Sequence, residues 1–168
     1  MTDLKRLVVE TPDFPRPGIL FRDISPLLRN HFEATISAVE SLFTDEEWRE
    51  VDALAGIESR GFILASALAV HRRKGFVPIR KRGKLPPPVI ELDYELEYGT
   101  STLEMHTGQG SLLLIDDVLA TGGTLRAAAD LSRRAGYEVI GIAVLIDLGL
   151  DSGFRWGRHG ARSAIQYG

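Results

Sequence analysis

Short, mostly apolar runs alternate along this chain with segments that carry apolar residues at helical spacing. Strands are expected at residues 51–56, 76–80, 111–117 and 138–147, and helices at residues 62–73 and 123–135. Apolar strands that alternate with helices are typical of a parallel sheet covered on both faces. The sequence therefore predicts an α/β fold, in which a central and mostly parallel sheet is flanked by helices.

Helix ends are marked by capping residues. Asn30 followed by Glu33, and Thr44 followed by Glu47, both match the capping-box spacing that begins a helix. Gly136 follows the predicted helix 123–135 and is expected to end it at the C′ position, where glycine is favoured.

Length and hydropathy predict one domain that spans residues 1–168. A chain of 168 residues, 44% of them hydrophobic, is long enough to bury a sizeable core. No apolar run approaches the roughly 18 residues of a membrane span, and the first residues do not have the pattern of a secretion signal. We therefore expect a cytoplasmic protein without a membrane partner.

Charge and residue usage exclude several classes of function. The net charge of −3 provides no general attraction to nucleic acid, yet residues 72–84 carry seven cations and no acid. Such a cluster predicts an anion nearby. The chain has no cysteine, and its four histidines lie far apart. A thiolate nucleophile is therefore excluded, and a histidine-rich metal site is not expected.

The segment LLLIDDVLATGGTL, residues 112–125, carries the strongest local signal for a binding site. A buried strand ends on Asp116 and Asp117, and a small turn from Ala120 to Thr124 then begins a helix. Ligands of such sheets bind beyond the carboxyl ends of the strands, and backbone N–H groups at a helix start favour a phosphate. The two carboxylates suit hydroxyl groups, a magnesium ion or a developing cation. A sugar phosphate fits both halves of this segment.

The segment also has a less specific interpretation. It could be an ordinary strand-to-helix turn with aspartate capping. It is neither a Walker loop, since no GxxxxGK[ST] occurs, nor a dinucleotide fingerprint, because GQGSLL lacks the third glycine and precedes a strand.

Two further segments are candidates for function. Residues 58–61 follow the first buried strand, and Arg60 there can bind an anion, although a plain surface arginine is the alternative. Residues 81–104 are basic and proline-rich at first, then acidic and aromatic. A stretch of this length inside a compact domain is expected to be a functional loop or a flap hairpin.

The two acids followed by TGGT resemble the phosphoribosyl-diphosphate (PRPP) signature of the type I phosphoribosyltransferases. Three more segments narrow the resemblance to the adenine phosphoribosyltransferase family: DFPRPGILFRDISPLL (13–28), GIESRGFI (56–63) with IRKRGKLP (79–86), and LEYG (96–99). The resemblance implies the type I fold with a mobile flap (81–104) over the active site and a base-binding hood (1–30). It also implies the reaction of adenine with PRPP to give AMP and pyrophosphate.

The resemblance also assigns residues to PRPP. Asp116 and Asp117 are expected on the ribose hydroxyls, and the 5′-phosphate site comprises Ala120, Thr121, Gly122, Gly123 and Thr124. The expected pyrophosphate site comprises Glu58, Ser59, Arg60, Gly61, Arg80, Lys81 and Lys84, with a cis peptide near Ser59. Arg72–Lys74 is expected to be only the solvated end of a helix, and Arg82 is left unassigned.

For the base, the resemblance places Phe21 on the purine face and the backbone of Leu20 and Arg22 at its edge. A reading without the resemblance makes Phe14, Ile19, Leu20 and Phe21 core residues of a proline-rich turn. Glu97 is expected to meet N7 of adenine and Tyr98 to cover the ribosyl centre, so that both act in catalysis with Asp116 and Asp117.

The cofactor and partners also follow from the resemblance. Mg²⁺ is expected to be held mainly by PRPP and water, with no direct protein ligand, and the chain to form a homodimer in which Arg80 reaches across the interface. The alternatives are a relative that uses hypoxanthine, guanine or xanthine, and a non-catalytic regulator that senses PRPP.

Overall fold

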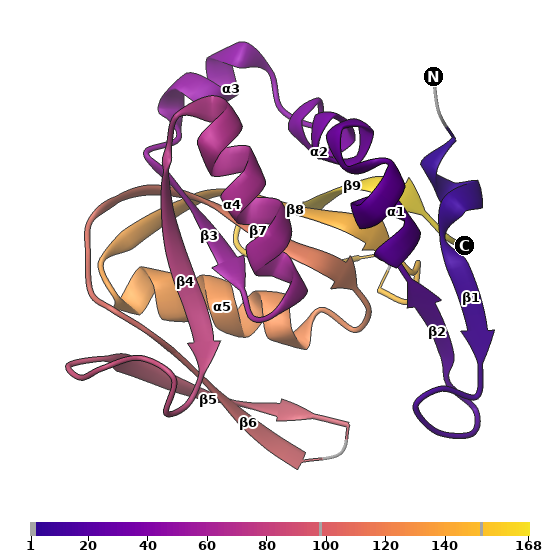
Figure 1. Ribbon diagram of the computed structural model, residues 1–168. Coiled ribbons are helices and arrows are strands. Elements are labelled where there is room, and N and C mark those ends of the chain that lie inside the picture. The colour runs from indigo at the N-terminus through magenta and orange to yellow at the C-terminus, as the bar shows by residue number, and fades with distance from the viewer. Residues whose placement is uncertain (1–2, 98, 152) are drawn as a thin grey trace.

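The computed structural model describes residues 3–97, 99–151 and 153–168, and its centre is a seven-stranded sheet (Figure 1). The strand order is β5-β6-β4-β3-β7-β8-β9. The strands are β3 (Ala53–Ile57), β4 (Gly75–Lys81), β5 (Ile90–Leu96), β6 (Gly99–Met105), β7 (Gly110–Leu119), β8 (Tyr137–Asp147) and β9 (Ala161–Gln166). Neighbours from β4 to β9 are parallel, whereas β5 and β6 pair antiparallel. The predicted mostly parallel α/β sheet is confirmed.

Helices cover both faces of the sheet, as the apolar strands require. Helix α4 (Arg60–Arg72) packs on β3 and β7, with α2 (Phe32–Glu40) beside it, and α5 (Gly123–Arg134) packs on the other face (Figure 1). Along β7, Leu113 belongs to the core under α4, whereas Leu112 and Leu114 belong to the core under α5. Full burial of each leucine stabilises the fold by about 1.5–3 kcal/mol.

The helix ends confirm two of the three predicted caps. Helix α3 (Asp45–Glu50) begins with a complete capping box between Thr44 and Glu47. Gly136 has φ of +105° just after α5, which fits its predicted role. The prediction for Asn30 is wrong, because Asn30 is the last residue of an unpredicted short helix, α1 (Ser25–Asn30), and α2 starts after His31 without a side-chain cap.

An N-terminal hairpin was not predicted as such. After a 3₁₀ turn, η1 (Leu4–Leu7), β1 (Val9–Pro12) pairs antiparallel with β2 (Leu20–Asp23) and forms a separate two-stranded sheet. These short strands bury little, so they lack the alternation that marks a half-buried strand. The reading of Phe14 and Leu20 as core residues is wrong, since they are 50% and 42% exposed.

Strands β5 and β6 give the second half of the segment 81–104 the form of a hairpin. Strand β5 pairs with β6 from Ile90↔Met105 to Leu96↔Gly99, and β6 joins the main sheet where Arg80 lies opposite Glu104. The basic, proline-rich part of the segment connects β4 to this hairpin. Among the described residues, no helix has the length and apolar character needed to cross a membrane.

Candidate active site

The carboxyl ends of β3, β4 and β7 meet at one edge of the sheet, because these strands are parallel neighbours. Three predicted site segments therefore come together: residues 58–61 after β3, residues 81–84 where β4 ends, and residues 120–124 after β7 (Figure 1). This edge is where ligands bind in open α/β sheets.

The first of these segments, residues 58–61, connects β3 to α4. The peptide between Glu58 and Ser59 is cis, as expected, and Glu58 N–H donates to the Ile79 carbonyl of β4 at 2.9 Å. At Gly61, a Cβ atom would lie 2.9 Å from Asp116 Oδ1 and 3.1 Å from the Ile115 carbonyl oxygen. Glycine therefore lets this loop pack directly against the end of β7.

Asp116 and Asp117 lie at this contact, each only 8% exposed. Asp117 N–H donates to Asp116 Oδ1 at 2.9 Å, and Arg60 Nε lies 2.7 Å from Asp117 Oδ2. Burial and the neighbouring charge of Asp117 raise the pKa of Asp116 well above its ordinary value. The two adjacent acids are thus distinct: Asp117 is paired with a cation, whereas ionisation of Asp116 is opposed.

The turn from Ala120 to Thr124 forms a small concave surface before α5. Residues 116–125 line a cavity of about 150 Å³ there. Gly122 has φ of +83°, and a Cβ atom on it would lie 2.6 Å from Phe154 Cδ2. Behind the turn, Arg126 donates to the Thr121 carbonyl at 3.1 Å and pairs with Asp151 at 2.7 Å. The turn is therefore supported from behind, with its backbone N–H groups at a helix start.

A second cavity of about 340 Å³ brings residues from several segments together. Its lining includes seven predicted site residues: Glu58, Ser59, Arg60, Lys81, Asp116, Asp117 and Thr124. It also includes side chains of the hairpin that were not predicted, namely Tyr94, Leu96, Ser101 and Leu103. Alternation along β5 was the available signal for Tyr94 and Leu96, but the pairing with β6 was needed to show which face they share.

The basic residues at the end of β4 and just after it have different surroundings. Arg80 Nε lies 2.9 Å from Glu58 Oε1, and its Nη1 donates to the Lys84 carbonyl at 3.4 Å. Lys81 and Lys84 are exposed. Arg82, which was left unassigned, pairs with Glu91 at 2.8 Å. Arg80 thus connects the 58–61 loop to the segment that carries the two lysines.

The earlier cations, by contrast, lie away from this edge at the end of α4. Arg72 pairs with Glu40 and, at 3.0 Å, with Asp45, and Arg73 is the C-cap residue. The expectation that this group is a helix end is confirmed.

Phe21 is half-buried on β2 and faces the loop residues. The Arg60 guanidinium lies over its ring at 5.4 Å, and Phe14 makes an edge contact with it at 5.1 Å between centroids. Arg22 instead lies over the Tyr167 ring at 4.1 Å. Leu20 is exposed at the start of the strand. Of Leu20, Phe21 and Arg22, it is therefore Phe21 whose side chain contacts a residue of the site, Arg60.

Glu97 lies in the exposed turn between β5 and β6, outside the lining of both cavities at this edge. Tyr98 falls outside the described residues.

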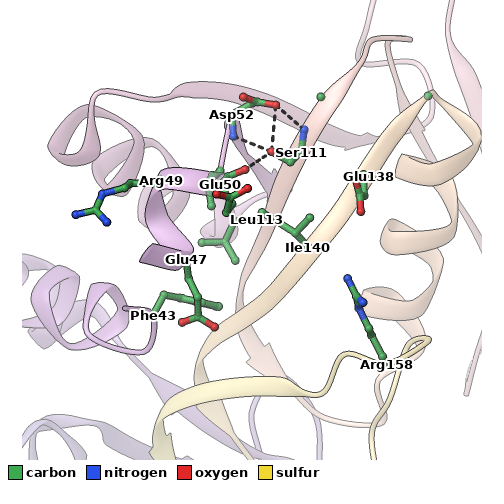
Figure 2. A pocket seen from close by; sticks show the side chains of 13 residues that line it. Phe43, Glu47, Arg49, Glu50, Asp52, Ser111, Leu113, Glu138, Ile140 and Arg158 are labelled. Carbon is green, nitrogen blue, oxygen red and sulfur yellow. Dashed lines mark hydrogen bonds between the residues drawn. The ribbon is translucent and has the colours of Figure 1, made fainter. Parts of the chain in front are cut away.

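The opposite edge of the sheet carries a wider cavity, of about 790 Å³ (Figure 2). Its lining contains none of the predicted site residues and mixes acids such as Glu50 and Glu138 with Arg49 and Arg158. Ser111 N–H donates to Asp52 Oδ2 at 2.8 Å, which joins the amino ends of β3 and β7. Because parallel sheets bind ligands at the carboxyl edge, volume alone does not identify the site here.

The chain is similar to proteins of known family. The family model for the phosphoribosyl transferase domain matches residues 28–154. An adenine phosphoribosyltransferase of Hydrogenovibrio crunogenus is 53% identical over 98% of this chain and 96% of its own. The crystal structure of adenine phosphoribosyltransferase from Rhodothermus marinus has a TM-score of 0.86 at 44% identity, covering 97% of this chain and 96% of that one. The APRTase of Giardia lamblia, complexed with 9-deazaadenine, has a TM-score of 0.86 at 35% identity, covering 99% and 97%.

Proposed function

Because the chain belongs to the adenine phosphoribosyltransferase family, we propose that it transfers the phosphoribosyl group of PRPP to adenine, giving AMP and pyrophosphate. This is a pentosyl transfer of purine salvage. The observation that carries the proposal is the shared cavity, where Arg60, Asp117 and Thr124 come from three loops at one sheet edge. The cation of Arg60 suits a diphosphate, and the carboxylate of Asp117 suits the hydroxyl groups of a sugar. The helix start at Thr124 suits a phosphate.

For the phosphate and sugar, we propose that residues 120–124 hold the 5′-phosphate of PRPP and that Asp116 and Asp117 hold the ribose hydroxyls. The small cavity lined by residues 116–125 and the backbone N–H groups at the start of α5 support the phosphate position. The carboxylates beside it suit hydroxyl donors and the positive charge that develops on the ribosyl centre.

For the diphosphate, we propose contacts from residues 58–61 and from Arg80, Lys81 and Lys84. Arg60 and Lys81 line the cavity, which supports their part in this proposal. Arg80 reaches the same loop through Glu58. Cations and backbone donors fixed in advance stabilise a leaving group that gains charge during the reaction.

For the base, we propose that residues 1–30 act as a hood, with Phe21 against the purine and the backbone of Leu20 and Arg22 at its edge. The contact of Phe21 with Arg60 supports this position beside the sugar site.

We propose residues 81–104 as a mobile flap whose Glu97 stabilises positive charge at N7 of adenine. Tyr98 would cover the ribosyl centre. Such a flap excludes water that would hydrolyse the activated sugar.

We also propose that Mg²⁺ binds together with PRPP. Asp116 and Asp117 offer carboxylate oxygens, which Mg²⁺ prefers, but the described residues contain no group of three or more acids or histidines that could hold an ion. We propose that PRPP and water supply most of the ligands of the ion, because Mg²⁺ commonly keeps several waters and binds substrate phosphates. When bound, the ion neutralises charge on the diphosphate.

The assembly and compartment remain proposals as well. We propose a homodimer in which Arg80 reaches the partner's diphosphate site, which requires its pair with Glu58 to open. Sedimentation of the purified protein tests the dimer.

We place the enzyme in the cytoplasm, because a charged sugar phosphate does not cross an apolar bilayer unaided.

The decisive experiment measures turnover of adenine, hypoxanthine, guanine and xanthine with PRPP. We expect AMP and pyrophosphate from adenine, with kcat/KM well above that for each other base. A tenfold preference for hypoxanthine would contradict the adenine assignment. Binding of PRPP without turnover of any base would identify a sensor instead of an enzyme.

A further inference from the structure

Glu104 on β6 is a buried acid that none of the roles above includes. It is only 2% exposed. Its carboxylate accepts hydrogen bonds from three consecutive backbone N–H groups: Gly83 to Oε2 at 3.1 Å, and Lys84 and Leu85 to Oε1 at 2.8 and 2.6 Å. A buried carboxylate is strongly unfavourable unless it is satisfied in this way, so the turn and the acid depend on each other.

The electrostatics favour the charged form of Glu104. Burial alone raises its pKa, but the three backbone N–H donors and the charge of Arg80 outweigh burial, and the pKa lies below its ordinary value. The hydrogen bonds to the turn are therefore made by a carboxylate, which binds N–H donors more strongly than a neutral acceptor does.

The turn that Glu104 holds belongs to the basic segment after β4. Lys84 is one of its residues, and Arg80 donates to the Lys84 carbonyl. Arg80 also pairs with Glu58 and lies opposite Glu104 in the β4–β6 register. Hydrogen bonds thus run from the hairpin strand β6, through residues 83–85 and Arg80, to the loop that begins α4.

We propose that Glu104 is a positioning residue for the diphosphate of PRPP. Its carboxylate fixes the 83–85 turn, and through that turn it holds Lys84 and Arg80 in place. This inference rests on the proposed function. Because Glu104 lies on β6, the same hydrogen bonds also join the hairpin to the basic turn within the proposed flap.

The test compares Glu104→Gln with Glu91→Gln. Glu91 lies directly opposite Glu104 on β5, but it is exposed and its partner is the side chain of Arg82. The glutamine at position 104 keeps the shape but loses the charge and turns one acceptor into a donor. We expect the KM for PRPP and the Kd for free pyrophosphate to rise about 10-fold in Glu104→Gln, as for loss of charged hydrogen bonds. The KM for adenine in Glu104→Gln should stay within about twofold of the value for the unsubstituted protein. In Glu91→Gln, all three constants should match those of the unsubstituted protein.

Hydrogen exchange provides a readout that does not depend on catalysis. The amides of residues 83–85 should exchange faster in Glu104→Gln, while those in the centre of the sheet, on β7, keep their protection. If Glu104→Gln does not fold, Glu104→Asp serves instead, because it keeps the charge and shortens the reach. It should show the same pattern, with smaller changes.

The outcomes separate this inference from the proposed function. Unchanged pyrophosphate binding and unchanged exchange at 83–85 would overturn the role of Glu104. So would faster exchange across the whole sheet with equal loss of affinity for adenine and PRPP, because that pattern indicates general destabilisation. Failure of the unsubstituted protein to convert adenine would overturn the proposed function alone, since pyrophosphate binding and exchange still report on Glu104.

Discussion

Arg60 links three segments that lie far apart in the sequence. Its guanidinium pairs with Asp117 after β7 and lies over Phe21 of the N-terminal hairpin, while its backbone begins α4. Arginine suits this position because a flat guanidinium can bind a carboxylate or phosphate and also stack on a ring.

At Gly122, in the turn before α5, the backbone geometry and the neighbouring side chains both restrict the residue type. It has φ of +83°, and a Cβ atom there would lie 2.6 Å from Phe154 Cδ2 and 2.7 Å from Arg126 Nη1. We expect Gly122→Ala to distort the turn proposed to hold the 5′-phosphate and to raise the KM for PRPP about 10-fold or more, because misplaced binding groups are costly in catalysis. Steady-state kinetics measures this change.

Gly157→Ala is the matched control for that substitution. Gly157 also has positive φ, +57°, but nothing lies within 4 Å of its Cβ position. We expect Gly157→Ala to destabilise the fold by about 1 kcal/mol through backbone strain and to leave the KM for PRPP unchanged. Equal kinetics for the two variants would show that crowding at Gly122 is irrelevant.

Metal removal tests the proposed Mg²⁺ that binds together with PRPP. We expect a chelator to abolish turnover and added Mg²⁺ to restore it, because the diphosphate then loses the cation that neutralises it. Circular dichroism should remain unchanged during chelation, since the described residues form no cluster of three metal-binding side chains. Full activity in the chelator would rule out the proposed cofactor.

At the scale of elements, the hairpin of β5 and β6 extends the sheet and also lines the site. Tyr94 and Leu96 of β5 contribute to the cavity that contains Arg60 and Asp117, and α5 packs under the hairpin. Glu97 lies at the exposed end of the hairpin. Its proposed action on adenine therefore requires the end of the hairpin to approach the base.

Glu97→Gln tests this element. We expect kcat with adenine to fall about 100-fold, because a neutral amide neither accepts the N7 proton nor stabilises charge there. The control is Glu95→Gln, an exposed acid on β5 two residues before Glu97, which should retain normal turnover. Full turnover by Glu97→Gln would remove the assignment of this residue.

Elements differ in how well the sequence predicted them. Four strands of the main sheet, β3, β4, β7 and β8, and the long helices α4 and α5 were predicted, because their apolar residues recur at a period set by local geometry. The N-terminal hairpin and α1 were missed, because short elements with little burial have no such period. The hairpin and α1 form because other segments of the chain pair with them or pack against them.

At the scale of the whole molecule, Glu47 connects distant parts of the fold. Arg162 of β9 pairs with Glu47 at 2.6 Å and also donates to the Leu42 carbonyl at 2.6 Å. The Arg162 side chain, and then the Thr44 N–H, lower the pKa of Glu47 from 4.5 to about 2. The folded protein therefore favours the ionised form of this acid.

This shift predicts how stability depends on pH. The contribution of Glu47 is fully present above its unfolded pKa of 4.5, and it is lost as pH falls toward about 2. We expect Glu47→Gln to destabilise the fold at pH 7 by about 1 kcal/mol, since solvent screens this partly exposed pair. Urea unfolding at several pH values should show the difference shrinking between pH 5 and pH 3.

Glu46→Gln is the control, because Glu46 is highly exposed and pairs with Arg49 only at 3.6 Å. It should change the unfolding free energy little at any pH. A constant difference between Glu47→Gln and the unsubstituted protein from pH 7 to pH 3 would contradict the ionic explanation.

The sequence by itself determined the alternation of strands and helices and the small turn at residues 120–124. It also separated the basic residues 72–74 from the basic residues 80–84. Each of these depends on spacing between near neighbours, which backbone geometry fixes locally. Only the tertiary structure decided that Arg60 pairs with Asp117, that Phe21 faces Arg60 and that Glu104 holds residues 83–85. Those contacts join residues far apart along the chain. They therefore depend on strand order and on burial, which make a distant partner the favourable one for a charged group.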